Sequence, residues 1–476
     1  MLFNSFEFLL FLPVVFLLYW FVFNKKLNLQ NLLLLVSSYI FYGWWDYRFL
    51  SLIIFSSIID FYCGLSIEKA HTKSTKKKWL LLSMFINLGF LGIFKYFNFF
   101  SQSLQEAFQS FGYQIDTLTL NIILPVGISF YTFQTMSYTI DVYRNKLKPT
   151  KDIIAFFAFV SFFPQLVAGP IERATNLLPQ FYKKRQFNYA NAVDGCRQIL
   201  WGLFKKIVVA DNCALIVNQV FDNYTEYNAS SLLIGSVFFA FQIYGDFSGY
   251  SDIAIGTSRL FGFNLMQNFA FPYFSRDIAE FWRRWHISLS TWFRDYVYIP
   301  LGGSRGGLWM KVRNTFIIFL VSGFWHGANW TFVIWGALNA IYFLPLLLLD
   351  KNRVNTNTVA ENNIVINFKE FIQVGTTFVL TLLAWVFFRA PNVSTAINYI
   401  YNMFSKTIFN FPTIDLKPLI FIFILVVFEW YNRTKEHGLE INNIKLTIFR
   451  WFIYLFVFCL ILIFGAQSQS FIYFQF

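Results

Sequence analysis

The chain has 476 residues, of which 57% are hydrophobic and 13% are charged, and phenylalanine alone occurs 65 times. Apolar runs of about 15 to 22 residues recur along its length, which predicts a polytopic α-helical membrane protein and excludes a string of soluble domains. Lysine and arginine (38) outnumber aspartate and glutamate (25), giving a formal net charge of +13. In a chain of this hydropathy, the excess indicates basic cytoplasmic loops beside a lipid bilayer, not nucleic-acid binding.

The basic loops orient the first five apolar segments. Lys25 and Lys26 follow the first segment, His71–Lys78 follows the third, and Arg144–Lys151 follows the fifth. By the positive-inside rule these loops are cytoplasmic, which places the N-terminus and residues 97–118 outside. The five spans are expected at about 8–23, 31–45, 49–67, 79–95 and 119–142.

The pattern is less regular after Lys151. Residues 153–169 run into PQLVAGPIER, whose prolines and glycine indicate a short or re-entrant segment. Residues 187–222 form an amphipathic region. With no visible linker or internal repeat, we expect one integral-membrane domain over 1–476, all-α, with about eleven transmembrane helices plus re-entrant and interfacial helices. Further spans are expected at about 231–245, 371–388, 414–430 and 446–465.

The stretch Thr315–Leu349 contains no Asp, Glu, Lys or Arg and carries His326 near its middle. A straight helix of this length would run roughly 50 Å, against a hydrocarbon core of about 30 Å, so a break is expected, most simply at Gly327. Counting from the basic loop that ends at Arg313 places His326 near mid-membrane. An ionisable group at that depth is a functional-site hypothesis. The alternative is a neutral core histidine bonded to a carbonyl.

A second histidine lies in the amphipathic stretch Phe281–Gly303, which is expected to form one interfacial helix ending at Pro300. At about 100° per residue, His286 falls on the aromatic face. Such a histidine is either a satisfied core residue or part of a site. His71 and His437 lie in charged loops and are expected to be solvated. The opposite, polar face of the helix is expected to carry Arg283, Arg284, Ser290, Thr291, Arg294 and Asp295.

Two histidines in apolar settings favour general base catalysis over other chemistry. Metal sites need three or four ligands, and no further His or Cys lies nearby in the sequence, so no metal is expected. No GxSxG motif supports a serine nucleophile. A general base requires only one neutral imidazole within reach of a hydroxyl, and burial favours the neutral form.

Two polar stretches leave alternatives open. GDFSGYSD places Asp246, Ser248 and Asp252 at the expected end of an apolar span, with glycines that allow tight packing. These residues either line a cavity or cap a helix. LGGSRGG, Leu301–Gly307, either approaches a phosphate through backbone N–H groups or forms a basic cytoplasmic turn, and the turn is favoured.

At these residues the sequence resembles the membrane-bound O-acyltransferase family, in particular its bacterial alginate O-acetylase branch and the similar peptidoglycan O-acetyltransferases. The resemblance extends over essentially the whole chain, and the blocks WRRWHISLS and FWHG are together highly specific. It rests on QLVAGPIER (Gln165–Arg173), YGDFSGYSDIAIG (Tyr244–Gly256), the block Asn268–Gly303, GFWHGANWTFVIWG (Gly323–Gly336) and FIYFQF (Phe471–Phe476), with FYGWWD near Phe41.

The resemblance implies a rim of many helices around a tunnel that crosses the bacterial inner membrane. His326 would correspond to the family's active-site histidine and His286 to its second signature histidine. An acyl thioester, either acetyl-CoA or an acylated carrier protein, would approach from the cytoplasm. Its acetyl group would reach an extracytoplasmic polysaccharide directly or through a secreted partner. Donor- or substrate-binding roles are expected for Arg283, Arg284, Trp325, Asn329, Asp246, Ser248 and Asp295.

Alternatives to acetylation of an alginate-like polysaccharide remain at this point. One is peptidoglycan O-acetylation. Relatives that transfer D-alanine to teichoic acid share the fold but depart in these sequence blocks. A different class of protein, an envelope-glycan flippase or other transporter, would use the histidines as proton relays. Transporters commonly contain inverted repeats and paired broken helices, whereas this sequence shows one broken region and no repeat.

Overall fold

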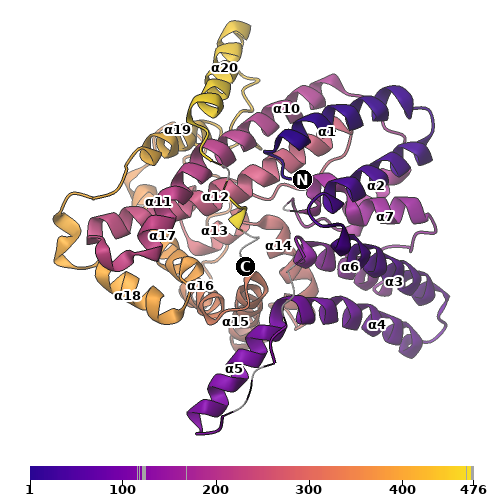
Figure 1. Ribbon diagram of the computed structural model, residues 1–476, viewed down its shortest axis with the longest axis horizontal. Helices are drawn as coiled ribbons and strands as arrows, with labels where there is room; N and C mark the ends of the chain where they lie inside the picture. Colours follow the sequence, from indigo (N-terminus) through magenta and orange to yellow (C-terminus); the bar gives the residue numbers. More distant parts are fainter. Residues whose placement is uncertain (115, 117, 121–124, 168, 468, 473–476) are drawn as a thin grey trace. The chain divides into compact units, whose positions relative to one another are not determined.

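A computed structural model of the chain describes residues 1–114, 116, 118–120, 125–167, 169–467 and 469–472 (Figure 1). The secondary structure in these ranges is helical throughout. Six helices are long and apolar enough to cross a membrane, and three shorter apolar helices accompany them. The expectation of a multi-pass helical membrane protein is thereby confirmed, while the number of about eleven crossings stays a prediction.

The described residues divide into two compact units. Unit 1 comprises Met1–Ala192 with Thr257–Met266, and unit 2 comprises Val193–Gly256 with Gln267–Phe476. Every residue singled out above as a site candidate belongs to unit 2. The single domain expected over the whole chain stays a prediction.

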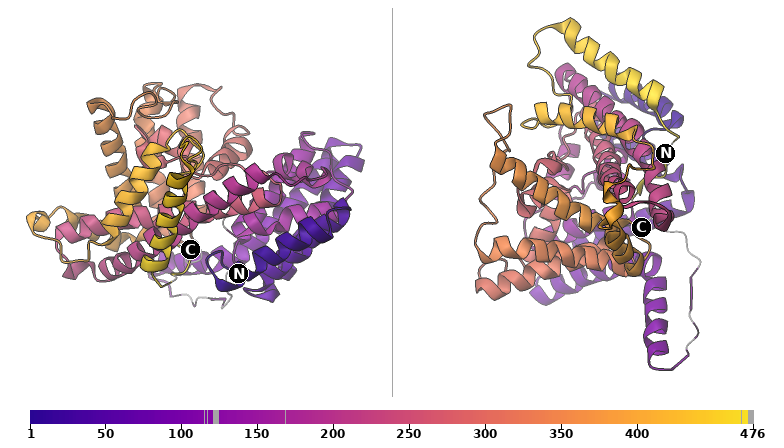
Figure 2. Two further views of the ribbon diagram at one scale, coloured as in Figure 1. Left: turned by 90° about the horizontal axis from the view of Figure 1, so that it is seen from above. Right: turned by 90° about the vertical axis from the view of Figure 1, so that its left-hand side faces the viewer.

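Unit 1 is built around α3, which packs against α4, α6 and α7. α5 follows α4 through the π-helical turn Gly92–Tyr96 and, as Figure 2 shows, projects away from the rest of this unit. The helices of unit 1 are α1 (Phe6–Leu17), η1 (Leu18–Val22), α2 (Leu27–Gly43), η2 (Tyr47–Phe49), α3 (Leu50–Lys69), α4 (Lys73–Leu91), η3 (Gly92–Tyr96), α5 (Phe97–Ser110), α6 (Ile128–Tyr143), α7 (Ile153–Ser161), α8 (Phe163–Leu166), α9 (Ala174–Leu177) and η4 (Leu178–Tyr182).

Hydrogen bonds between buried polar side chains join α3, α4 and α6. The Asp60 carboxylate contacts Ser83 Oγ at 2.5 Å and accepts a hydrogen bond from Asn87 Nδ2 at 2.9 Å. Ser56 and Thr135 both donate to Asn87 Oδ1. Such side-chain bonds hold membrane helices together where the hydrophobic effect cannot, because lipid is as apolar as the helix surface.

The expected segments of unit 1 are met with one difference. The segment 119–142 falls partly on 121–124, outside the described residues, and α6 begins only at Ile128. The break expected near Pro164 is present, because α7 ends at Ser161 and the short α8 follows.

Unit 2 holds the second half of the chain. Two of its helices extend into the residue ranges of unit 1: α10 begins there, and α12 ends there. Its core is the pair α15 and α16, with α17 packed on α16. The helices are α10 (Tyr189–Leu203), η5 (Phe204–Ala210), α11 (Asp211–Asp222), η6 (Tyr224–Glu226), α12 (Ala229–Leu260), η7 (Pro272–Phe274), α13 (Ile278–Arg284), α14 (Ile287–Phe293), η8 (Arg294–Tyr298), α15 (Gly307–His326), α16 (Trp330–Leu348), α17 (Phe368–Arg389), α18 (Val393–Met403), η9 (Lys406–Phe409), α19 (Pro418–Tyr431) and α20 (Thr447–Phe464).

Two sequence expectations in unit 2 are wrong. The span expected to end at residue 245 continues as the 32-residue helix α12, so Asp246 and Asp252 lie inside a helix and not at its end. The single helix expected over Phe281–Gly303 is interrupted between α13 and α14, and its last turns are the π-helix η8. Leu301–Gly307 forms the expected turn before α15.

The break expected at Gly327 is confirmed, because α15 ends at His326 and α16 begins at Trp330. The two helices form a hairpin that is closed by glycines. A Cβ atom added to Gly323 would lie 2.3 Å from the Phe332 carbonyl oxygen, and one added to Gly336 would lie 2.3 Å from that of Phe319. The two backbones therefore approach as closely as they do because both positions lack a side chain.

We predict that Gly323→Ala destabilises the hairpin by about 1–3 kcal/mol, since one methyl group forces the two backbones apart. Gly375→Ala in α17 is the matched control, because a Cβ there meets nothing within 4 Å. Thermal unfolding of the detergent-purified variants should show a lower midpoint for Gly323→Ala only. Equal midpoints would contradict the assigned contact.

Candidate active site

His326 is the last residue of α15 and is 4% exposed. Aromatic rings from three helices surround it. The ring centroids of Trp325, Trp335 and Phe388 lie 4.9, 5.1 and 5.4 Å from that of the imidazole. The histidine therefore lies at a helix end, where the chain turns, inside an aromatic enclosure made by α15, α16 and α17.

His286 occupies the break between α13 and α14. Its backbone is left-handed, with φ 44° and ψ 54°, a conformation that non-glycine residues seldom adopt and that the surroundings must stabilise. Asn268 supplies much of this support. Its backbone carbonyl accepts from Ile287 N–H at 2.9 Å, and its side-chain Oδ1 accepts from Ser288 N–H at 3.3 Å and from Ser288 Oγ–H at 2.8 Å.

The same Asn268 oxygen fixes the tautomer of His286. The Ser288 backbone N–H can only donate, so the side-chain atom of Asn268 that it faces must be the oxygen. Nδ1 of His286 lies 3.1 Å from that oxygen and must therefore carry the proton. The basic lone pair of the neutral ring is then on Nε2. His286 lies outside the six helices that could cross the membrane. Burial lowers its pKa to about 3, so the ring is neutral at physiological pH.

The ring of Trp325 packs against both histidines. Its ring centroid is 6.2 Å from that of His286 and 4.9 Å from that of His326. A second aromatic connection runs through Trp285, Trp385 and Trp335, whose successive centroids are 5.1 and 5.7 Å apart. The two histidines that the sequence singled out thus both pack against one indole ring.

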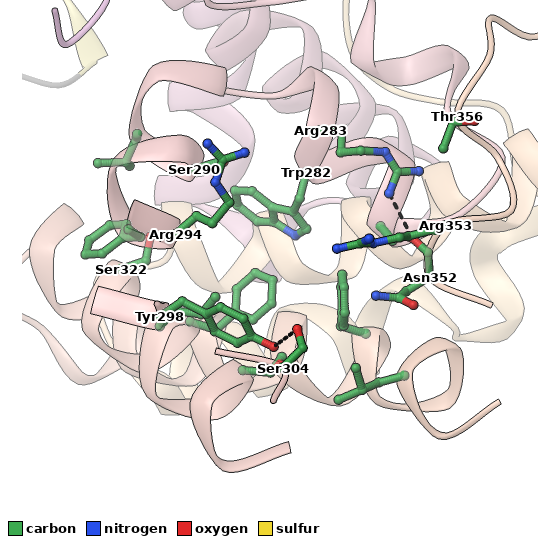
Figure 3. Close-up of a pocket in the computed structure, with 18 residues that line it drawn as sticks. Trp282, Arg283, Ser290, Arg294, Tyr298, Ser304, Ser322, Asn352, Arg353 and Thr356 are labelled. Carbon is green, nitrogen blue, oxygen red and sulfur yellow. Dashed lines mark hydrogen bonds between the residues drawn. The ribbon is translucent and has the colours of Figure 1, made fainter. Parts of the chain in front are cut away.

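A cavity of about 450 Å³ opens next to this cluster. Figure 3 shows Arg283, Arg294 and Arg353 around it, with Trp282 among them. Its interior is apolar and aromatic, and its wall includes Ser322 of α15. Ser322 lies one helical turn before His326, about 6 Å along the axis, on the same face of the helix. The cavity therefore leads from exposed guanidinium groups to within one turn of the imidazole. Its apolar wall includes Leu289, Phe293, Phe319 and Phe343.

The arginines predicted to bind the donor have different positions. Arg283 lines the cavity, and its guanidinium also donates to the carbonyls of Asn352 and Asn355 at 2.9 and 2.6 Å. Arg284 is instead held by the buried carboxylate of Glu280 at 2.9 Å, away from the described cavity lining. Asp295 is paired with Arg294, itself a lining residue, at 2.7 Å.

Asp246 and Ser248 lie on α12 and are buried. The Asp246 carboxylate pairs with Lys206 at 2.8 Å and accepts from Ile472 N–H at 2.7 Å, so it anchors the C-terminal segment. The Ser248 hydroxyl has no hydrogen-bond partner within the described residues. Phe247, between them in sequence, packs edge-on against His286 at 4.6 Å between centroids.

Asn329 caps α16 by accepting from Thr331 N–H at 3.0 Å, and its amide donates to the Pro391 carbonyl at 2.8 Å. Both ends of this side chain therefore hold the turn that follows His326.

His437, expected to be solvated, is 1% exposed, and its Nε2 lies 3.2 Å from the Asp194 carboxylate. That expectation is wrong because a charged loop can still fold over its histidine.

Sequence reasoning missed Asn268 and Ser322. Asn268 lies 18 residues before His286, in a loop without periodicity. Ser322 was one of several small residues in an apolar stretch, and only its position one turn before His326 could have indicated it.

These features define a multi-pass membrane protein with a buried histidine pair beside a cavity that cations surround. Comparison with known proteins shows which family and which relatives the chain matches. Residues 79–385 match the membrane-bound O-acyltransferase family. The chain is 40% identical to a probable alginate O-acetylase of Pseudomonas aeruginosa over 448 residues. This aligned region is 94% of this chain and 80% of that protein. It is 36% identical over 421 residues to a peptidoglycan O-acetyltransferase of Helicobacter pylori. The alignment covers 83% of this chain and 77% of that protein.

A more distant relative is a teichoic acid D-alanyltransferase of Bacillus subtilis, 30% identical over 232 residues, which are 46% of this chain and 58% of that protein. The chain belongs to the membrane-bound O-acyltransferase family. It is an acyltransferase, and the transporter alternative has no support from these comparisons.

We predict that Asn268→Ala lowers acyl transfer by about 100-fold, because the left-handed turn loses its acceptor and His286 loses its fixed tautomer. Asn268→Asp keeps the acceptor and should restore folding. Its carboxylate favours imidazolium and so raises the pKa of His286, which adds a loss of activity as the pH falls toward 5. Rates between pH 5 and 8 test this. A profile identical to that of the unchanged protein would contradict it.

Proposed function

We propose that the chain moves an acetyl group from a cytoplasmic thioester donor across the inner membrane for O-acetylation of an extracytoplasmic polysaccharide. One observation carries the proposal: a cavity with three arginines leads to within one helical turn of His326. The names of the relatives, a probable alginate O-acetylase among them, support acetyl as the group and an alginate-like glycan as the acceptor. Transfer is direct or through a secreted partner.

The chemistry of the cavity suits the arm of a thioester cofactor. Coenzyme A and acyl carrier proteins both present an acyl group on a long pantetheine arm that ends in phosphate. Guanidinium groups bind phosphate through paired, charge-assisted hydrogen bonds, and the apolar interior accommodates the arm. Arg283, Arg294 and Arg353 would meet the phosphates, and Phe319 and Phe343 would pack along the arm.

Charge supports a cytoplasmic donor. Because α15 and α16 form a hairpin, the start of α15 and the end of α16 lie on the same side of it. Lys311 and Arg313 lie near that start, and Lys351 and Arg353 follow that end. By the positive-inside rule this side faces the cytoplasm of a bacterial inner membrane. We propose further that the chain forms a single domain of about eleven membrane crossings around a tunnel. The family match over residues 79–385 supports a single domain, because it includes residues of both units.

In the proposed reaction, neutral His326 accepts the proton of an acceptor hydroxyl while that oxygen attacks the thioester carbonyl. The carbon–sulfur bond breaks, and the imidazolium returns the proton to the departing thiolate. The aromatic enclosure favours the neutral ring that a base requires. His286, which packs against Trp325, positions the donor end of the site, and Asn329 holds the turn that aims His326.

A second acceptor has a specific observation behind it. The Helicobacter pylori relative acts, by its name, on peptidoglycan, and it matches 83% of this chain. The matching residues do not distinguish the two glycans, so peptidoglycan is the alternative acceptor.

We predict that His326→Gln reduces acetyl transfer by about 10²- to 10⁴-fold, since the general base is lost. Transfer of labelled acetyl from acetyl-CoA, and from an acetylated carrier protein, to alginate and peptidoglycan fragments would be measured in membranes at matched protein levels. His71→Gln, an exposed histidine, is the control. Undiminished transfer in the His326 variant would overturn the mechanism.

We predict that Arg353→Gln raises the KM for the donor by about 3- to 30-fold with little change in kcat, because it removes one charge-assisted contact made equally in ground and transition states. The Arg353 side chain has no hydrogen bond or ion pair in the described part of the chain, so the fold should not change. Lys351→Gln, two residues away and outside the cavity lining, is the matched control. Equal KM values for the two variants would contradict the donor assignment.

A further inference from the structure

A second cavity, of about 500 Å³, lies within unit 1 and has no part in the reaction described above. It is lined by the end of α1, the π-helical turn η1, the residues that follow, and the segment 184–187. Aromatic and basic side chains make up most of its lining. Aromatic rings come from Phe16, Trp20 and Phe187, and positive charges come from Lys25, Lys184 and Arg185.

Arg185 is the buried cation of this cavity, at 7% exposure. One guanidinium nitrogen donates to Asn31 Oδ1 at 2.7 Å, and the group lies over the Phe263 ring at 4.8 Å. Its Nε, however, has no hydrogen-bond partner within the described residues. A buried charged donor without an acceptor is costly unless a ligand completes it.

Lys25 and Lys184 are exposed and make no hydrogen bond or ion pair in the described part of the chain. No carboxylate lines the cavity among the residues that the structure describes. Three positive charges therefore converge without a counter-charge, and such an arrangement favours an anion with several acceptor oxygens.

The aromatic wall indicates that this anion belongs to a lipid. α1 and η1 form one of the apolar helices, and Trp20 and Phe21 lie at its end, just before the basic residues. This sequence of aromatic then basic residues is typical of the level where a helix leaves the hydrocarbon. Phe21 is 74% exposed, and Trp20 is fixed by a hydrogen bond from its Nε1 to the Leu260 carbonyl at 2.9 Å. Apolar surface and cations meet at one site, as an amphiphile requires.

We propose that this cavity binds the head group of an anionic phospholipid. The phosphodiester lies against Lys25, Lys184 and the Nε of Arg185, and the acyl chains follow the exposed face of η1 at Phe21. A free phosphate would share the three charges but would leave the aromatic wall unused, so the lipid is the occupant. The site tethers the first transmembrane segment to the segment 184–187.

The test uses the full chain, purified in detergent and delipidated. Dioleoylphosphatidylglycerol should raise its unfolding midpoint by about 2 °C or more, and native mass spectrometry should show one bound lipid. Dioleoylphosphatidylcholine and inorganic phosphate should do neither. Lys25→Gln/Lys184→Gln should lose both effects. Lys77→Gln/Lys78→Gln, which removes the same charge from exposed positions on α4 of the same unit, should keep them.

Three results would overturn the proposal. An equal shift with phosphatidylcholine would show that lipid charge is irrelevant. A shift produced by inorganic phosphate alone would assign the site to a soluble anion. An undiminished shift in Lys25→Gln/Lys184→Gln would place the lipid elsewhere. The lipid-free midpoint of that variant should equal that of the unchanged chain, because neither ammonium group is bonded, and Lys184→Gln alone serves as a milder second variant.

Discussion

The close contact of α15 with α16 at Gly323 and Gly336 is the constraint on which the site depends. It folds an uncharged stretch back on itself, so the chain turns between two apolar helices. A helix that ends in such surroundings must satisfy its terminal backbone groups locally. Asn329 does so for α16, and the turn that it caps leaves His326 at the end of α15, where the imidazole can be enclosed by rings from α16 and α17.

Both histidines use the same local device. His326 ends one helix, and His286 precedes another, so neither is held in the regular face of a continuous helix. A helix end frees a side chain from the 3.6-residue periodicity and lets neighbouring loops orient it. At His286 that loop is the one containing Asn268, which supports a left-handed backbone and a defined tautomer with one oxygen atom. Trp325 then links the two rings in one aromatic cluster, because it packs against both.

These particulars show what a sequence can and cannot predict here. The break at Gly327 was predictable because length and missing charge are properties of the stretch itself. The break at His286 was not predictable, because the residues around it fit a continuous amphipathic helix. The interaction that stabilises the break comes from Asn268, which lies 18 residues earlier in a loop. The glycines of α12 were expected to allow tight packing, and they do: a Cβ added to Gly249 would lie 2.8 Å from the Gly202 carbonyl oxygen. The end of the span expected at the same place is wrong, because α12 continues through these glycines to Leu260.

The two cavities share a composition but differ in what they can do. Each combines aromatic walls with three cations, which suits an amphiphilic phosphate ligand in both cases. In unit 2 the cavity wall continues along α15 to Ser322, one turn from a histidine, and its Arg283 is already fixed by backbone carbonyls. In unit 1 no His, Cys, Asp or Glu is found among the described lining residues, and two of the three cations are unbonded. The proposed proton acceptor, His326, lies one helical turn beyond the Ser322 wall of the first cavity, and this is why we propose group transfer for the first cavity and lipid binding for the second.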